Sequence, residues 1–149
     1  MAGEKPLDAD LSGTTMVITG ASSGIGAAAT ERLQTMGAAV VVVGRSPEKT
    51  RKVAERLGVE PEVCDFAELQ QVHDLADRLL ERCPRIDVLA NNAGGLLTKR
   101  RMTTDGNEAM TQANHLGGFL LTVLLAERLT SSAPSRVITT SSVGHWWAM

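Results

Sequence analysis

Short apolar runs alternate along the chain with longer segments in which apolar residues recur at helical spacing. The second run, residues 38–43, is an uninterrupted Ala/Val segment, as expected of a strand that is covered on both faces. Alternation of this kind predicts a parallel sheet wrapped by helices, which is an α/β fold. The predicted strands cover residues 14–19, 38–43, 59–64, 86–90 and 136–141.

Two helices are marked by local start and stop signals. A first helix is expected from Gly24, with Gly37 placed to close it. A second is expected to have Ser46 as its N-cap and Pro47 at its first position, and to end at Gly58. The apolar face predicted for the first helix consists of Ile25, Ala28, Ala29, Leu33 and Met36.

Two further helices are predicted from periodicity. The third is expected over residues 67–82, where Asp65 suits an N-cap and Glu68 stands three residues on, as in a capping box. The fourth helical pattern runs over residues 105–129, and we expect a kink at Gly117-Gly118. Together these elements predict a doubly wound parallel sheet, Rossmann-like and incomplete, of about five strands with helices on both faces.

Composition and charge narrow the class of protein. A chain of 149 residues with 43% hydrophobic and 21% charged residues has room for one compact domain. A net charge of −2 argues against non-specific binding to nucleic acid or to an anionic membrane surface. Cys64, Cys83 and three scattered histidines show no metal-ligand spacing, so no metal site is expected. Residues 1–13 do not resemble a signal peptide and no run is long enough for a membrane span, which favours a cytoplasmic setting.

A glycine-rich turn carries the strongest chemical signal. The sequence TGASSGIG at residues 19–26 joins a predicted strand to a predicted helix. Glycines there let the backbone turn sharply and approach a pyrophosphate, while free N–H groups and the helix dipole favour the anion. The alternative is that Gly20 and Gly24 serve only a tight turn. We favour anion binding because of the strand before the turn and the helix after it.

The residue after the second strand indicates the type of nucleotide. A carboxylate at this point would bind a ribose 2′-hydroxyl, whereas an arginine accommodates a 2′-phosphate. The strand ends at Gly44-Arg45 with no acid at that position, which favours NADP(H) over NAD(H). The alternative is that Arg45 is an ordinary solvated loop residue.

Four motifs occur in order along the chain: TGASSGIG at 19–26, NNAG at 91–94, Asn114 within ANHLGG, and a serine within SRVITTSSVG. In order and approximate spacing, the motifs resemble those of the short-chain dehydrogenase/reductase family. The stretch TTDGNEAMTQANHLGGFLLTVLL is most similar to the retinol-dehydrogenase-like branch. The resemblance implies that residues 14–149 are a dinucleotide-binding Rossmann-like domain, the N-terminal part of a longer family domain, preceded by an extension over residues 1–13.

The resemblance also implies roles for individual residues. Phosphates of the cofactor would face the glycine-rich turn, the 2′-phosphate would face Arg45 and Ser46, and the adenine would lie beside Asp65 and Phe66. For the asparagines of NNAG, an equally strong alternative is that they only tie neighbouring turns to the sheet. The remaining cofactor contacts implied are Gly20, Ser22, Ser23, Gly24, Ile25, Asn91, Ala93 and Gly94.

Members of the family use a catalytic tetrad of Asn, Ser, Tyr and Lys. The resemblance assigns Ser142 to the serine that binds the substrate oxygen and Asn114 to the asparagine that anchors a proton relay. The chain contains no tyrosine, and it ends seven residues after Ser142, before the Tyr-x-x-x-Lys pair. Because general acid/base transfer typically supplies about 10² to 10⁴ in rate, we expect this chain to be inactive alone.

The sequence therefore predicts the cofactor-binding portion of an NADP-dependent oxidoreductase. It would transfer a hydride between nicotinamide and a small-molecule carbonyl or secondary alcohol. The alternative is a non-catalytic nucleotide-binding or regulatory module that ends naturally at Met149. Exposed apolar surface at the incomplete sheet edge leaves a homo-oligomer open.

Overall fold

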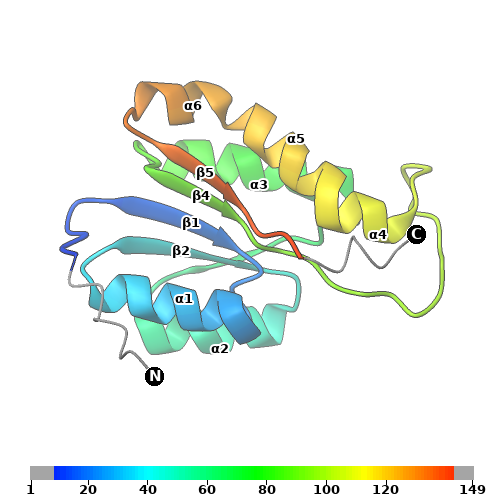
Figure 1. The fold of residues 1–149 in the computed structure, drawn as a ribbon, viewed down its shortest axis with the longest axis horizontal. Coiled ribbons are helices and arrows are strands. Elements are labelled where there is room, and N and C mark those ends of the chain that lie inside the picture. Colours follow the sequence, from blue (N-terminus) through cyan, green and yellow to red (C-terminus); the bar gives the residue numbers. More distant parts are fainter. Residues whose placement is uncertain (1–8, 143–149) are drawn as a thin grey trace.

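The computed structural model describes residues 9–142, which form one sheet with helices on both faces (Figure 1). The order of strands is β3-β2-β1-β4-β5, and every neighbouring pair is parallel. This arrangement confirms the predicted doubly wound α/β fold. The strands are β1 (Thr15–Thr19), β2 (Ala39–Gly44), β3 (Pro61–Val63), β4 (Val88–Asn91) and β5 (Arg136–Thr139).

Two helical layers enclose the sheet. Helices α1 (Gly24–Thr35) and α2 (Pro47–Leu57) lie on one face, and α3 (Leu69–Arg82), α5 (Gly117–Leu124) and α6 (Ala126–Ser131) lie on the other (Figure 1). Strand β2 shows both faces in use: Val40 and Val42 join the core under α1 and α2, whereas Val41 and Val43 join the core under α3 and α5. The apolar residues of β2 are therefore buried on both faces of the sheet, as predicted.

The rotation of α1 differs from the prediction. Its buried residues are Gly26, Ala27 and Thr30, whereas Ile25 is 79% exposed. A Cβ atom at Gly26 would lie 2.2 Å from the carbonyl oxygen of Gly20. The helix therefore presents its smallest residues to the turn before it, and this close approach, rather than the apolar stripe, decides which face is buried.

Helix α3 starts without the predicted capping box. Asp65 Oδ1 accepts a hydrogen bond from the N–H of Ala67 at 3.0 Å, and Glu68 accepts one from the hydroxyl of Thr104. The first helical N–H, that of Leu69, instead donates to Asp105 Oδ2 at 3.2 Å. The helix begins two residues later than predicted because its cap comes from a residue 36 positions further along the chain.

The helical pattern predicted over residues 105–129, with its kink at Gly117-Gly118, is wrong in its start and in the place of its interruption. Gly106 has a φ of 81°, which no right-handed helix accommodates, and the backbone around it forms a turn. Helix α4 (Ala109–Thr111) begins after Glu108, whose carboxylate accepts from the N–H groups of Met110 and Thr111. A π-helical turn, η1 (Gln112–Leu116), then leads into α5 at Gly117, so the irregularity precedes the glycine pair.

The direction of winding reverses between β1 and β4. Strands β2 and β3 lie to one side of β1, and β4 and β5 lie to the other. In open α/β sheets, ligands bind outside the carboxyl ends of the strands at such a reversal. The topology therefore places a candidate site where β1 ends at Thr19 and β4 ends at Asn91. The predicted boundary at residue 13 stays a prediction, and residues 1–8 and 143–149 lie outside the described part of the chain.

Candidate functional site

The turn after β1 lies so close to neighbouring backbone that only glycine fits at Gly20. Gly20 has a φ of 70°, and a Cβ atom on it would lie 2.9 Å from Cα of Ala93. The approach of Gly26 to the same turn leaves no room for a side chain either. The backbone after β1, the first turn of α1 and the loop after β4 are thus in direct contact at the point where the winding reverses.

The tip of α1 leaves backbone donors available. Ser23, the N-cap, has an extended backbone and makes no side-chain cap. Within residues 9–142, no hydrogen bond uses the N–H of Gly24, Ile25 or Gly26. Gly24 has a φ of 56° and nothing within 4 Å of the position of a Cβ atom. Free N–H groups at a helix N-terminus, together with the helix dipole, form an anion-binding site.

Thr19 fastens the loop after β4 to this turn. Its buried hydroxyl oxygen accepts hydrogen bonds from the N–H groups of Asn92 and Ala93, at 3.0 and 2.9 Å, and the hydroxyl donates to the carbonyl of Ala90. The side chain of Asn92 donates to the carbonyl of Thr19 and accepts from the hydroxyl of Thr140. The NNAG motif therefore does tie adjacent turns to the sheet, which was one of its two predicted roles.

Asn91 is different from its neighbour. Its Nδ2 donates to the hydroxyl of Thr122 at 2.9 Å, but its buried Oδ1 has no partner among residues 9–142. Gly118 lies against this side chain, with a Cβ position 3.4 Å from Oδ1. A buried acceptor without a donor is costly unless something else binds it, so Asn91 is a polar group that remains to be satisfied at the edge where the site lies.

Arg45 and Ser46 follow β2 on the other side of the reversal. Ser46 caps α2 as predicted, because its Oγ accepts from the N–H of Lys49. Arg45 is exposed, and its side chain forms no hydrogen bond or ion pair within the described residues. Gly44 has to be glycine because Thr50 and Ser22 both approach it, and this contact places Ser22 beside the start of α2.

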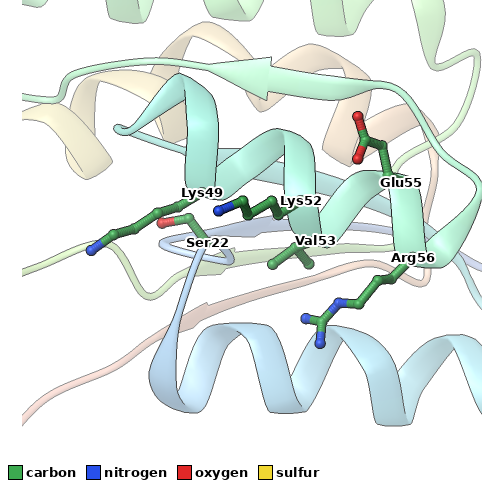
Figure 2. Close-up of a pocket in the computed structure, with 6 residues that line it drawn as sticks. All are labelled: Ser22, Lys49, Lys52, Val53, Glu55 and Arg56. Carbon is green, nitrogen blue, oxygen red and sulfur yellow. The ribbon is translucent and has the colours of Figure 1, made fainter.

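A cavity of about 650 Å³ lies between this turn and α2 (Figure 2). Figure 2 shows Ser22 beside Lys49 at one end of the cavity, with Lys52 and Arg56 further along the helix. Lys52 is paired with Glu48, and Arg56 with Glu31, whereas Lys49 is exposed and has no ion pair in the described part of the chain. Lys49 was not among the residues predicted from the sequence. The signal available was its position three residues after the Ser46 cap, which brings it to the same end of α2 as Arg45.

Asp65 and Phe66 lie after β3, on the outer side of β2. The side chain of Phe66 is buried in the core and packs against Gly117, where a Cβ atom would lie 2.9 Å from the ring. Only the backbone of Phe66 can therefore face a ligand at this edge. Asp65 is half-buried, and its Oδ1 holds the N–H of Ala67. The adenine contact of this pair stays a prediction.

Asn114, on η1, clamps the loop after β4. Its Oδ1 accepts from the N–H of Gly95 and its Nδ2 donates to the carbonyl of Gly95, both at 2.9 Å. Gly94 lies beside it, with a Cβ position 3.4 Å from Oδ1. Two bonds to one peptide backbone fix the position of this loop relative to η1.

Ser142 is exposed and lies three residues beyond β5. Strand β5 pairs with β4, and the N–H of Thr140 donates to the carbonyl of Asn91. Ser142 therefore belongs to the same carboxyl edge as Asn91. Within residues 9–142, no group of three His, Cys, Asp or Glu side chains is placed to hold a metal ion, and no helix has the length and apolar character needed to cross a membrane.

A comparison with protein families matches residues 14–145 to the family described as short chain dehydrogenase. The chain belongs to the short-chain dehydrogenase family. Its relatives include a Streptomyces sp. (strain C5) protein, provisionally named daunorubicin C-13 ketoreductase DnrU, which is 53% identical over 138 residues. Human retinol dehydrogenase 13 is 36% identical over 150 residues. The matches cover 89% and 96% of this chain but 47% and 45% of the relatives, so this short-chain dehydrogenase spans about half their length.

Solved structures of the family share the fold. A provisionally assigned short chain dehydrogenase from Escherichia coli CFT073, complexed with NADPH, has a TM-score of 0.76 at 29% identity, over 92% of this chain and 62% of that one. One from Shigella flexneri 2a, complexed with NADP, has a TM-score of 0.74 at 30% identity, over 89% of this chain and 61% of that one. The fold and the retinol-dehydrogenase-like resemblance predicted from sequence are thus confirmed.

Proposed function

We propose that this short-chain dehydrogenase chain is the cofactor-binding portion of an NADP(H)-dependent oxidoreductase. The observation that carries the proposal is the set of N–H groups at the tip of α1 that are unused among residues 9–142, at the point between β1 and β4 where the direction of winding reverses. The names of two relatives, a ketoreductase and a retinol dehydrogenase, agree in one reaction class. That class is the interconversion of a carbonyl and an alcohol.

The residues present fit a dinucleotide. A Cβ atom at Gly20 or Gly26 would fill the turn, so the backbone can approach a pyrophosphate closely there. The N–H groups of Gly24, Ile25 and Gly26 would bind its oxygens, and the exposed side chain of Ile25 would give an apolar contact next to them. The buried Oδ1 of Asn91, which has no hydrogen-bond partner among residues 9–142, lies at the same edge. When bound, the nicotinamide ring supplies or accepts the hydride.

Preference for the phosphorylated cofactor would come from the cations after β2. Arg45 and Lys49 are both exposed, both lack a carboxylate partner among residues 9–142, and both lie at the N-terminal end of α2, where the helix dipole also favours an anion. A 2′-phosphate would bind Arg45 through a fork of donors and Lys49 as a point charge. No carboxylate stands at the end of β2 to bind the 2′-hydroxyl of the non-phosphorylated cofactor.

Two residues would serve the substrate. In our proposal, the hydroxyl of Ser142 binds the substrate oxygen, and Asn114 holds the proton relay while its side-chain amide fixes Gly95. No tyrosine is present to act as the acid or base, so we expect this chain to bind cofactor without turnover. The activity that we expect of this chain is therefore cofactor binding, and not hydride transfer.

The test is a titration of the 149-residue chain with NADPH and NADH, followed by cofactor fluorescence. We expect NADPH to bind more tightly, and Arg45→Ala and Lys49→Ala each to raise its Kd by about tenfold, the value of a lost charged hydrogen bond, without changing the Kd of NADH. Arg51→Ala, which removes an exposed charge from the same helix, is the matched control. Equal affinities for both cofactors would refute the NADP preference, and no binding at millimolar concentration would refute the cofactor site.

A further inference from the structure

Gln112 is a buried amide with every hydrogen-bonding position used. It lies on η1 and is fully buried. Its Nε2 donates to the carbonyl of Ala67 at 2.8 Å and to Asp105 Oδ2 at 2.7 Å. Its Oε1 accepts from the hydroxyl of Thr103 at 2.8 Å and from Asn107 Nδ2 at 2.9 Å. A carboxamide has two donors and two acceptor positions, so no other uncharged side chain of this size matches these four partners.

The bonds of Gln112 hold the segment after β3. Ala67 is fixed at its carbonyl by Gln112 and at its N–H by Asp65 Oδ1. Asp105, the second acceptor, also receives the first N–H of α3 from Leu69. One side chain of η1 thus binds the loop over residues 65–67 directly and the start of α3 through Asp105.

Asn114 holds the other loop from the same π-helical turn. Residues two positions apart on a helix do not face each other, so Gln112 and Asn114 reach in different directions. Gln112 contacts the loop after β3, and Asn114 contacts Gly95 in the loop after β4. The five-residue turn η1 thus bridges the loop after β3 and the loop after β4. In the sheet, strands β3 and β4 are separated by β2 and β1.

We propose that Gln112 is a positioning residue that fixes the separation between the loop after β3 and the loop after β4. The inference rests on the proposed dinucleotide site, whose adenine end would meet the first loop and whose nicotinamide end would meet the second. A ligand that contacts both loops gains affinity when their separation is already set, because less ordering is needed on binding. A ligand that contacts one loop gains much less.

The test compares a whole cofactor with half of it. NADPH reaches both loops, and adenosine 2′,5′-bisphosphate reaches only the adenine side. For Gln112→Met, which keeps the length of the side chain and removes its four hydrogen bonds, we expect the Kd of NADPH to rise about tenfold and that of the bisphosphate about threefold or less. Asp105→Ala, at an exposed position, is a milder second variant and should show losses in the same order.

Ser132→Ala is the matched control. Ser132 is a buried side chain that accepts from the N–H of Ile86 and donates to the carbonyl of Arg128, away from both loops. It should lower the stability of the fold and leave both Kd values unchanged. Equal losses for the two ligands in Gln112→Met would show a role at the adenine side alone and would overturn the proposal, as would no loss for either.

A readout without ligand separates this proposal from the proposed function. In the free protein, we expect Gln112→Met to speed exchange of the Gly95 N–H, measured by NMR, because Asn114 is no longer held in register. Ser132→Ala should leave that rate unchanged. If wild-type protein binds no cofactor, the proposed function fails while the Gly95 exchange still reports on the link between the loops. An unchanged rate of Gly95 exchange in Gln112→Met would overturn the positioning role itself.

Discussion

At the residue scale, the carboxyl edge of the sheet is organised by short polar side chains that bind backbone atoms. Thr19 accepts two N–H groups from the loop after β4, Asn114 binds both polar groups of Gly95, and Gln112 binds the carbonyl of Ala67. Each of these bonds joins segments that are separated by at least 19 residues in the sequence. Together they hold three loops in fixed relation without any ion pair.

Glu108 adds a titratable group to this region. Its carboxylate accepts from the N–H of Met110 and then from that of Thr111, and these bonds hold the pKa of Glu108 below its ordinary value of 4.5. Because the pKa is lower in the folded chain than in the unfolded chain, the carboxylate stabilises the fold fully above about pH 4.5. The contribution is lost as the pH falls through the folded-state pKa.

We therefore expect Glu108→Gln to lower the melting temperature at pH 7, and the difference from wild type to shrink below pH 4.5. Thermal unfolding between pH 3 and pH 7 measures it. Glu81→Gln, which changes an exposed carboxylate on α3 that accepts no hydrogen bond among the described residues, is the control. A difference that stays constant down to pH 3 would contradict the assignment.

Residue by residue, the sequence predicted the backbone-determined part of the site better than the side-chain network. The positions of Gly20 and Ser46 follow from local rules for turns and caps, and the structure confirms the turn and the cap. Thr19 and Gln112 could not be selected from sequence, because the contacts that give them their roles, with Asn92 and Ala67, span 73 and 45 residues. Lys49 was missed for a different reason: its position three residues after the Ser46 cap is informative only once the cavity beside it is known.

At the scale of elements, the structure differs from the periodicity in two helices: in the face of α1 that is buried, and in the start of the helical segment over residues 105–129. The apolar stripe of α1 predicted that Ile25 is buried, but the contact between Gly26 and Gly20 sets the rotation of the helix. The pattern over residues 105–129 contained enough apolar spacing for one helix, but Gly106 and the cap at Glu108 delay its start. The ends of α2 followed from sequence because they depend on local signals, the Ser46 cap and the Gly58 stop.

Gly26 gives a test of the first contact. We expect Gly26→Ala to lower the free energy of unfolding by about 1–3 kcal/mol, the usual cost of an added methyl group in a packed site, and to weaken NADPH binding, because the turn has to move away. Gly58→Ala is the matched control: Gly58 has a φ of 66° and open space around it, so it should cost about 1–2 kcal/mol of strain and leave binding unchanged. Urea denaturation and NADPH titration measure both.

Tolerance of Gly26→Ala in both assays would show that the turn can rearrange at little cost. Equal weakening of NADPH binding by Gly58→Ala would show that loss of stability, rather than the position of the turn, controls affinity. Either result would contradict the role assigned to the close approach of α1.

At the scale of the whole molecule, the two edges of the sheet are covered unequally. All four residues of β5 are exposed, with Val137 at 45% and Ile138 at 51%. Neighbouring residues on a strand point to opposite faces, so both faces of β5 are accessible. At the other edge, β3 is short and exposes Val63 at 36%. An exposed apolar edge strand is a site for association.

We expect the chain to self-associate through β5 in solution. The double variant Val137→Thr/Ile138→Thr keeps the preference for a strand and removes apolar surface, and it should shift the sedimentation velocity distribution toward monomer. Val63→Thr, the same kind of change at the opposite edge, is the control and should leave the distribution unchanged. A wild-type chain that is monomeric at high micromolar concentration would refute this expectation.

The central place of β1 has a consequence for how the protein is made. Among the five strands of the sheet, β1 leaves the ribosome first, yet its glycine turn is fastened by the N–H groups of Asn92 and Ala93, which are synthesised more than 70 residues later. A nascent chain that has released only its first three strands would lack that fastening and the neighbouring strand beside β1. We therefore expect the turn after β1 to reach its final form only once β4 and the loop that follows it have emerged.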